Sequence, residues 1–243
     1  QGFKTHPLVQ ACEGYDGPYK LKECFDRWKA LCRERFLQLK EAEEELNRLF
    51  IETYKLGSEL TPDVDDVNIS IHIADRSLDI KSLLSYAVGC LFGRFSPDRP
   101  GLIYAGGEWR PEQYSILTPD KDGIIPICDD EYFEDDMVGL IIKFVGTVFG
   151  AETLEQNLSF IADSLGGKGS PRKVIRDYFV NDFYKDHSSV FSGTAGKKPI
   201  YWLFDSGKKN GFKCLIYMHR YQPDTIARIR TDYVHEQQSR YRT

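Results

Sequence analysis

Apolar residues in the first quarter of the chain recur every three, four or seven positions on a strongly charged background. This spacing places them along one side of a helix, and Gly57 stands where a helix C-cap is common. The pattern predicts one long helix in residues 19–57, which at about 1.5 Å per residue would reach roughly 57 Å. The apolar seam consists of Leu21, Phe25, Trp28, Cys32, Leu39, Leu46, Leu49 and Thr53.

Two interpretations of the long helix stay open. It either contributes to the core of its own domain or acts as a coiled-coil spacer that packs against a partner helix. A candidate partner is the final helix predicted for residues 222–243, in which Pro223 lies just inside the start and Ile226, Ile229 and Tyr233 recur at spacings of three and four. We therefore expect these two helices to run side by side.

Residues 58–196 predict a helical domain with one short strand and one long loop. Val67–Ala74 alternates between apolar and polar residues, as a strand does. The apolar run Asp79–Phe95 predicts a buried helix, and residues 97–126, rich in Pro and Gly, predict a long surface loop. Further helices are predicted at residues 130–149, 154–165 and 171–187, the last with Ser170 as N-cap and Pro171 in its first turn.

Two β-branched and aromatic runs near the C-terminus flank a turn-forming segment. Pro199–Phe204 and Lys213–Tyr221 are typical of strands, and Asp205–Gly211 has the residues of a hairpin turn. The chain is therefore predicted to be mainly α-helical with a small antiparallel β element, an α+β fold. Its predicted parts are an N-terminal arm (1–18), a long helix (19–57), a helical domain (58–196), a basic β-hairpin (197–221) and a C-terminal helix (222–243).

Composition predicts a cytoplasmic chain without a metal or disulfide framework. No apolar run approaches 18 residues and the N-terminus lacks a signal-peptide pattern, so we expect no membrane contact. The cysteines form no CxxC pair and lie at irregular intervals, which favours reduced thiols over a zinc site or a disulfide scaffold. They are Cys12, Cys24, Cys32, Cys90, Cys128 and Cys214.

The formal net charge of −5 argues against DNA binding by the chain as a whole, because autonomous nucleic-acid-binding domains are more often basic. Acidic residues are concentrated between Asp120 and Asp136, however, and basic residues crowd the stretch 197–230. We therefore expect faces of opposite sign, the basic one being a candidate for phosphate contact or simply a solvated surface. The candidate DNA-contacting residues are Lys208, Lys209, Lys213, Arg220, Arg228 and Arg230.

Long strings distributed along the chain are FKTHPL at 3–8, EEELNRLFIETYKL at 43–56, DIKSLLSYAVGCLFGRFS at 79–96, DEYFEDDMV at 130–138 and KPIYWLFDSGKKNGFKCLIYMHRYQPDTIARIRTDYVH at 198–235. In this order they resemble the C-terminal region of the PglX family, adenine-specific DNA methyltransferases of bacterial BREX phage-defence systems and relatives of type IIG restriction-modification enzymes. The resemblance implies a fragment of a much longer, S-adenosylmethionine-dependent enzyme that acts on double-stranded DNA. It favours the spacer interpretation of the long helix.

The residues needed for methyl transfer are missing. An adenine methyltransferase needs a Gly-rich turn after a strand to approach the cofactor and an Asn/Asp-Pro-Pro-aromatic loop to hold the flipped base. The chain has no Pro-Pro pair, and Gly106 and Gly107 lie in a loop without a clear βα context. We expect no catalytic residue, no bound cofactor and no metal site in this chain.

A metal-dependent nuclease is a weak third hypothesis. Restriction nucleases hold a divalent metal with Pro-Asp and a later Asp/Glu-x-Lys, and Pro62, Asp63, Asp79 and Lys81 fit that string. The second half should lie on a core strand, but here it has helical periodicity. Without ligand spacing, the histidines and the acidic stretch favour ordinary surface or structural roles; they are His6, His72, His187, His219, His235 and Asp120, Asp122, Asp129, Asp130, Glu131, Glu134.

One functional hypothesis and one alternative follow. The chain is predicted to be the non-catalytic C-terminal region of an adenine-specific DNA methyltransferase, which positions the enzyme and its specificity module on DNA with the long helix as a spacer. The alternative is a protein-interaction module that docks the methyltransferase to other defence-system subunits.

Overall fold

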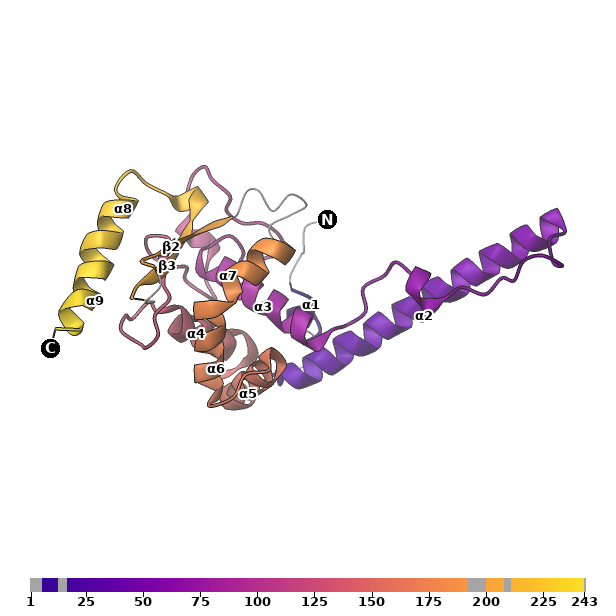
Figure 1. The fold of residues 1–243 in the computed structure, drawn as a ribbon, viewed down its shortest axis with the longest axis horizontal. Coiled ribbons are helices and arrows are strands. Elements are labelled where there is room, and N and C mark those ends of the chain that lie inside the picture. Colours follow the sequence, from indigo (N-terminus) through magenta and orange to yellow (C-terminus); the bar gives the residue numbers. More distant parts are fainter. Residues whose placement is uncertain (1–5, 13–16, 192–199, 208–210, 243) are drawn as a thin grey trace.

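The structure is a computed structural model that describes residues 6–12, 17–191, 200–207 and 211–242. A globular body carries one long projecting helix, α2 (Leu21–Tyr54), and the chain returns along that helix through an irregular stretch, residues 56–75, here called the return segment (Figure 1). The other α-helices are α1 (Pro7–Gln10), α3 (Arg76–Leu91), α4 (Met137–Phe149), α5 (Leu154–Leu165), α6 (Pro171–Asn181), α7 (Phe183–Asp186), α8 (Thr225–Arg228) and α9 (His235–Arg240). The strands are β1 (Ile124–Pro126), β2 (Tyr201–Asp205) and β3 (Lys213–Tyr217).

The predicted fold class, mainly α with a small antiparallel sheet, is confirmed. Short 3₁₀ turns and two π-helical stretches connect or extend the α-helices; they are Asp66–Asn68, Pro111–Gln113, Ala151–Thr153 and Met218–Arg220, and His187–Phe191 and Ile229–Val234. Among the described residues no single helix is long and apolar enough to cross a membrane; only α4 with the segment Ala151–Leu165, bent by 118°, satisfies that test as a pair.

The long helix is confirmed as one unbroken element of 34 residues. It ends at Lys55, whose left-handed φ of 57° forms the C-cap that the sequence suggested for Gly57. Its buried side chains all lie in the inner half of the helix; they are Leu21, Cys24, Phe25, Cys32 and Phe36. The first three pack into the body's core.

The predicted pairing of the long helix with the C-terminal helix is wrong. α8 and α9, joined by the π-helical stretch Ile229–Val234, lie at the opposite end of the molecule from the outer half of α2 (Figure 1). The return segment contacts α2 instead: Lys40 Nζ donates to Asp66 at 2.7 Å, and Asn47 Nδ2 donates to the Pro62 carbonyl at 3.2 Å. The C-terminal helix buries Ile229 and Tyr233 against the sheet. The apolar stripe that was predicted to pack against α2 is therefore already covered by the sheet.

The strand predicted for Val67–Ala74 is also wrong. This part of the return segment forms a 3₁₀ turn and then irregular chain, and Val67 is 90% exposed. Alternating side chains stabilise a strand only when a neighbouring strand pairs with its backbone. In the described structure the neighbour of Val67–Ala74 is the helix α2. The backbone N–H and C=O groups of a helix are bonded within the helix and cannot pair with a strand.

Four helices, α3 to α6, pack against one another as the bundle of the body. α3 begins at Arg76, earlier than predicted, because Asp75 caps it by accepting from Leu78 N at 2.7 Å. α4 begins at Met137, later than the predicted Asp130, because the Asp136 carboxylate accepts from Val138 N and Gly139 N.

The remaining bundle helices follow the sequence more closely. α5 has the predicted bounds, whereas the helix predicted for 171–187 breaks at Asp182 into α6, α7 and a π-helical stretch. Ser170 caps α6 as predicted, by accepting from Lys173 N at 3.4 Å.

The predicted hairpin is confirmed as β2 and β3, and β1, which the sequence did not indicate, pairs antiparallel with the other side of β3. The side chains of β3 alternate between two cores. Leu215 and Tyr217 face the helical bundle, whereas Cys214 and Ile216 pack in a second core with the C-terminal helix. The sheet is therefore the middle layer between the bundle and the C-terminal helix.

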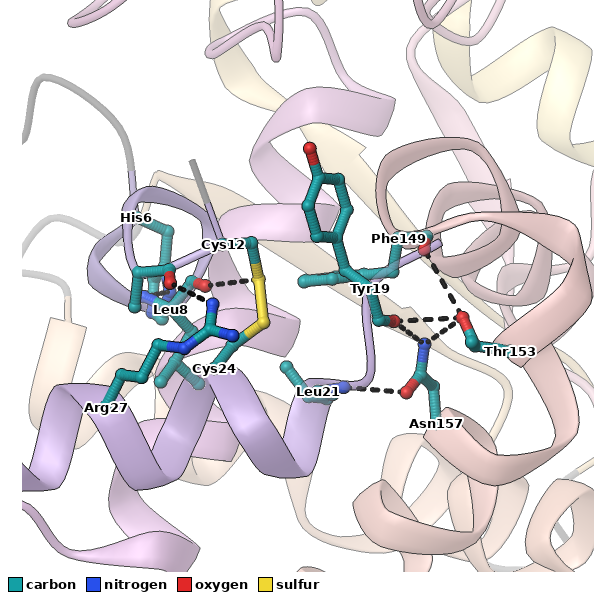
Figure 2. Close-up of a disulfide and its surroundings, with 11 residues drawn as sticks. His6, Leu8, Cys12, Tyr19, Leu21, Cys24, Arg27, Phe149, Thr153 and Asn157 are labelled. Carbon is teal, nitrogen blue, oxygen red and sulfur yellow. Dashed lines mark hydrogen bonds between the residues drawn. A yellow bond between two sulfur atoms is a disulfide. The ribbon is translucent and has the colours of Figure 1, made fainter. Parts of the chain in front are cut away.

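The expectation of reduced thiols is wrong for two cysteines. Cys12, just after α1, forms a disulfide with Cys24 in the first turn of α2 (Figure 2). The spacing of 12 residues gave no signal of this contact, which depends on how the N-terminal arm folds back onto α2. The other four cysteines are buried free thiols.

The base of α2 is also held by a side chain of α5. Asn157, only 1% exposed, accepts from the Leu21 amide at 2.7 Å and donates to the Tyr19 carbonyl at 2.9 Å (Figure 2). The first amides of a helix have no partner within the helix, so Asn157 supplies a cap from outside. The direction in which α2 leaves the body is therefore fixed by the bundle as well as by the disulfide.

Candidate interaction surfaces

Lys213, the first residue of β3, is used inside the fold. Its side chain is 12% exposed, its Nζ donates to the Val180 carbonyl at 3.0 Å, and it lies 3.5 Å from an Asp205 carboxylate oxygen. These contacts fasten the hairpin to the end of α6. Little of the ammonium group remains available to a phosphate.

Arg220 is likewise held by the chain itself. Its guanidinium donates to the Asp120 carbonyl at 2.6 Å and the Lys121 carbonyl at 2.8 Å, and its Cζ lies 4.2 Å from the centre of the Trp109 ring. Burial lowers the pKa of Arg220 from its usual value, although the group remains cationic. The arginine thus connects the chain after β3 to two loops that precede β1.

Arg228 and Arg230 point to solvent from the C-terminal helix. This helix buries one narrow stripe, formed by Thr225, Ile229, Tyr233 and Gln237, and exposes most of the rest of its surface. Arg228 Nε donates to Asp224 at 2.7 Å, a hydrogen bond that raises the pKa of Arg228. Lys208 and Lys209, in the β2–β3 turn, lie outside the described residues.

An acidic groove borders the same helix. The Tyr233 hydroxyl donates to Asp135 at 3.0 Å and lies 3.2 Å from Asp122. Burial, followed by repulsion from Asp122, raises the pKa of Asp120 to about 7. Among the described residues no group of three or more His, Cys, Asp or Glu side chains is arranged to hold a metal ion. One side of the C-terminal helix therefore lies beside negative charge, and Arg240 of that helix lines the same groove.

The outer half of α2 exposes an apolar stripe that includes Leu46 and Leu49 of the predicted seam. Leu46, Leu49 and Phe50 are each 53% exposed, and Tyr54 is 66% exposed. Their spacings of three and four put them on one face of the helix, beside the face covered by the return segment. The outer half of α2 and the adjoining part of the return segment, residues 37–67, carry nine carboxylates and only three basic side chains.

The nuclease string is not brought together. Asp63 lies on the return segment next to Pro62, which contacts Asn47 in the outer half of α2. Asp79 is on α3, where it hydrogen-bonds to His72 at 3.1 Å, and Lys81 forms an ion pair with Asp186 at 2.8 Å. These carboxylates do not face one another across a common site.

The glycine pair that comes nearest in sequence to a cofactor-binding turn does not lie in the setting that such a turn needs. Gly106 and Gly107 have φ values of 106° and 89° in an exposed loop, and neither a strand precedes them nor a helix N-terminus follows directly. The described sheet is antiparallel, without the strand–turn–helix unit that cradles such a cofactor. No step of methyl transfer is assigned to this chain.

Comparison with known proteins confirms the resemblance found in the sequence. Over 98% of its length the chain is 44% identical to the adenine-specific methyltransferase PglX of Lacticaseibacillus casei (strain Zhang), and over 68% of its length it is 46% identical to the adenine-specific methyltransferase BrxX of Escherichia coli O9:H4 (strain HS). The matched parts make up 20% and 15% of those proteins. No family model matches the chain.

Proposed function

We propose that this chain, which corresponds in sequence to 20% of one adenine-specific methyltransferase and 15% of another, is a non-catalytic part of a DNA-modifying enzyme that positions the enzyme on DNA. α2 is its spacer, and the C-terminal helix with the β2–β3 turn is its DNA-facing end. S-adenosylmethionine and the catalytic residues belong to other parts of the full-length protein.

The exposed stripe on α2 is the observation that carries the proposal. Isolated helices are marginally stable in water, and half-exposed Leu46, Leu49 and Phe50 gain little from burial within this chain. A second helix laid along the stripe would cover these residues by knobs-into-holes packing. The full-length enzyme supplies that helix, and the pair holds the body away from the catalytic part.

Charge supports the orientation of this spacer. Residues 37–67, the outer half of α2 with the adjoining part of the return segment, carry nine carboxylates and three basic side chains. This part of the molecule therefore repels phosphate and attracts a helix with basic flanks. Arg228 and Arg230 are at the other end of the molecule (Figure 1). We therefore place the DNA at the C-terminal helix.

Salt dependence of duplex binding by the full-length enzyme tests the DNA-facing end. Each phosphate that is no longer neutralised should lower the slope of log affinity against log salt by about 0.9, because one fewer counterion is released. Replacing Lys208, Lys209, Arg228 and Arg230 with alanine should therefore flatten the slope by up to about 3.6.

The control for this test is Lys22→Ala at the base of α2, 70% exposed and paired with Asp26, which should leave the slope unchanged. Lys213→Ala should lower stability rather than the slope, because its contacts are internal. An unchanged slope in the fourfold variant would contradict DNA contact at this end.

Docking of other defence-system proteins is the second candidate, and the acidic, apolar outer half of α2 favours it. The double variant Leu46→Ser/Leu49→Ser separates the two. A spacer inside the enzyme predicts faster proteolysis of α2 and slower methylation by the purified full-length enzyme. A docking surface predicts normal methylation by the purified enzyme and loss of co-purification with another subunit.

A further inference from the structure

A partly open cavity of about 160 Å³ lies in the body, apart from the surfaces described above. α3 forms its floor, the turn after α3 and the start of β2 form its walls, and the π-helical stretch beginning at His187 closes it from one side. His6, preceding α1, closes it from another. Five separate parts of the chain therefore converge on one small space.

The backbone at the end of α3 builds one wall. Gly93, with φ of 78°, donates its amide to the Cys90 carbonyl at 3.0 Å, and Arg94 donates to the Gly89 carbonyl at 2.8 Å. This pattern of two bonds is a Schellman turn, which reverses the chain and returns Arg94 and Phe95 over α3. A Cβ on Gly89 would lie 2.4 Å from the Phe95 ring, so glycine permits this close return.

Two serine–histidine pairs line the cavity. Ser85 Oγ lies 2.6 Å from His187 Nδ1, and Ser82 Oγ lies 3.2 Å from His6 Nε2. Burial lowers the pKa of His6 to about 3 and, together with the positive charge of Arg94, that of His187 to about 4. Near neutral pH both imidazoles are uncharged and contribute hydrogen-bonding groups rather than charge.

Arg94 is the cation of the cavity. It is partly buried, its Nη1 lies 3.5 Å from the Tyr217 hydroxyl, and its guanidinium lies 5.5 Å from the centre of the Phe95 ring. Among the described residues no carboxylate lies within ion-pair distance of it. A partly desolvated guanidinium is stabilised by an anion, which the described residues do not provide.

We propose that this cavity binds a small organic anion, a monocarboxylate with a flat apolar body. Arg94 pairs with the carboxylate, the Ser85 and His187 pair hydrogen-bonds beside it, and Tyr86 and Tyr201 contact the apolar part. A protein cavity of about 150 Å³ accommodates benzene, so the space fits a ligand of one ring. Binding is non-covalent and independent of the proposed role in DNA positioning.

Calorimetric titration of the 243-residue chain with benzoate tests the site, with benzamide as a neutral analogue of nearly the same shape. Benzoate should bind saturably with a dissociation constant of about 1 mM or tighter, and benzamide at least about tenfold more weakly. Arg94→Met should weaken benzoate at least about tenfold, and Arg94→Lys should weaken it less. Arg110→Met, which removes an exposed arginine paired with Glu108, is the matched control and should bind normally.

A second variant keeps the proposal testable if Arg94→Met fails to fold. Ile200→Trp fills the cavity from the start of β2 while leaving Arg94 in place, and it should abolish binding with an unchanged circular dichroism spectrum. Failure of benzoate to saturate, equal binding of benzamide, or full binding by a folded Arg94→Met or Ile200→Trp variant would each overturn the proposal. DNA binding by the full-length enzyme should be unaffected by Ile200→Trp, so this proposal and the DNA-facing proposal fail separately.

Discussion

α3 and the outer half of α2 are both helices with an apolar face, yet they lie in opposite environments. Ile80, Leu83 and Leu84 of α3 are at most 1% exposed, and α4 and α5 pack against this helix. Leu46 and Leu49 of α2 are 53% exposed, and of the described residues only the return segment lies alongside. Apolar periodicity thus predicts a helix with an apolar face, without indicating whether the same chain covers that face.

The largest expected effect of a single substitution is in the body. Phe92, the C-cap of α3, is fully buried, and its ring centre lies 5.0 Å from that of Tyr201 and 5.8 Å from that of Tyr217. Phe92→Ala removes these ring contacts and leaves a cavity, so it should lower the free energy of unfolding by about 3–5 kcal/mol. Urea denaturation followed by circular dichroism measures this change. A cost below about 1 kcal/mol would mean that the body is packed more loosely than described.

Removing the disulfide at the base of α2 should give the next largest loss of stability. The Cys12–Cys24 disulfide closes a loop over a separation of 12 residues, and constraining the unfolded chain in this way is worth about 3 kcal/mol. The double variant Cys12→Ser/Cys24→Ser should lose about that much stability against denaturant. Adding a thiol reductant should lower the stability of the unaltered chain by about the same amount as the double substitution does. The reductant should not change the stability of the double variant. Equal effects of reductant on both proteins would contradict the disulfide.

A carboxyl group of the body should make stability depend on pH. The folded-state pKa of Asp120 is about 7, whereas an unperturbed Asp has a pKa of about 3.9. Between these values the folded state binds more protons than the unfolded state, so stability should fall as the pH rises from about 4 to about 7. Asp120→Asn should remove this decline and raise stability at pH 8 by on the order of 2 kcal/mol. Denaturation at pH 5 and at pH 8 compares the two proteins, and a parallel decline in both would exclude Asp120 as its source.

The smallest effect should come from the outer half of α2. Phe50 is 53% exposed, so Phe50→Ala should change the free energy of unfolding of the 243-residue chain by at most about 0.5 kcal/mol. The same denaturation experiment used for Phe92→Ala provides the comparison. A destabilisation near that of Phe92→Ala would show that another part of this chain covers the stripe in solution and would remove the contrast between the two helices.

The sequence predicted the elements whose signals are local. α5 has its predicted bounds because Gly166 adopts the left-handed C-cap conformation, and α6 begins as predicted because Ser170 and Pro171 form its first turn. The hairpin was predicted for the same reason, since both strands and their turn are contiguous. β1 was missed because a three-residue strand inside a Pro- and Gly-rich loop is stabilised only by its distant partner β3.

The candidate site was predictable as a list of charged residues but not as a surface. Lys213 and Arg220 bind main-chain carbonyls of Val180, Asp120 and Lys121, and carbonyls have no signature in a sequence. Arg228 and Arg230 remain exposed, which depends on the C-terminal helix packing through one narrow stripe. The cavity around Arg94 combines residues from five distant segments, so no motif indicated it.

α2 and the return segment run side by side, but only α2 is helical. The same length of the projection therefore takes a different number of residues on its two sides. The contacts Asn47–Pro62 and Lys40–Asp66 match seven residues of α2, which at about 1.5 Å per residue span about 10 Å, with four residues of the return segment. Deleting seven residues from the outer half of α2 and four from the return segment would shorten the projection by about 10 Å while keeping the apolar stripe on the same side. Insertions or deletions of unequal length on the two sides of the tip at Lys55 can therefore change the length of the projection and leave the body unchanged.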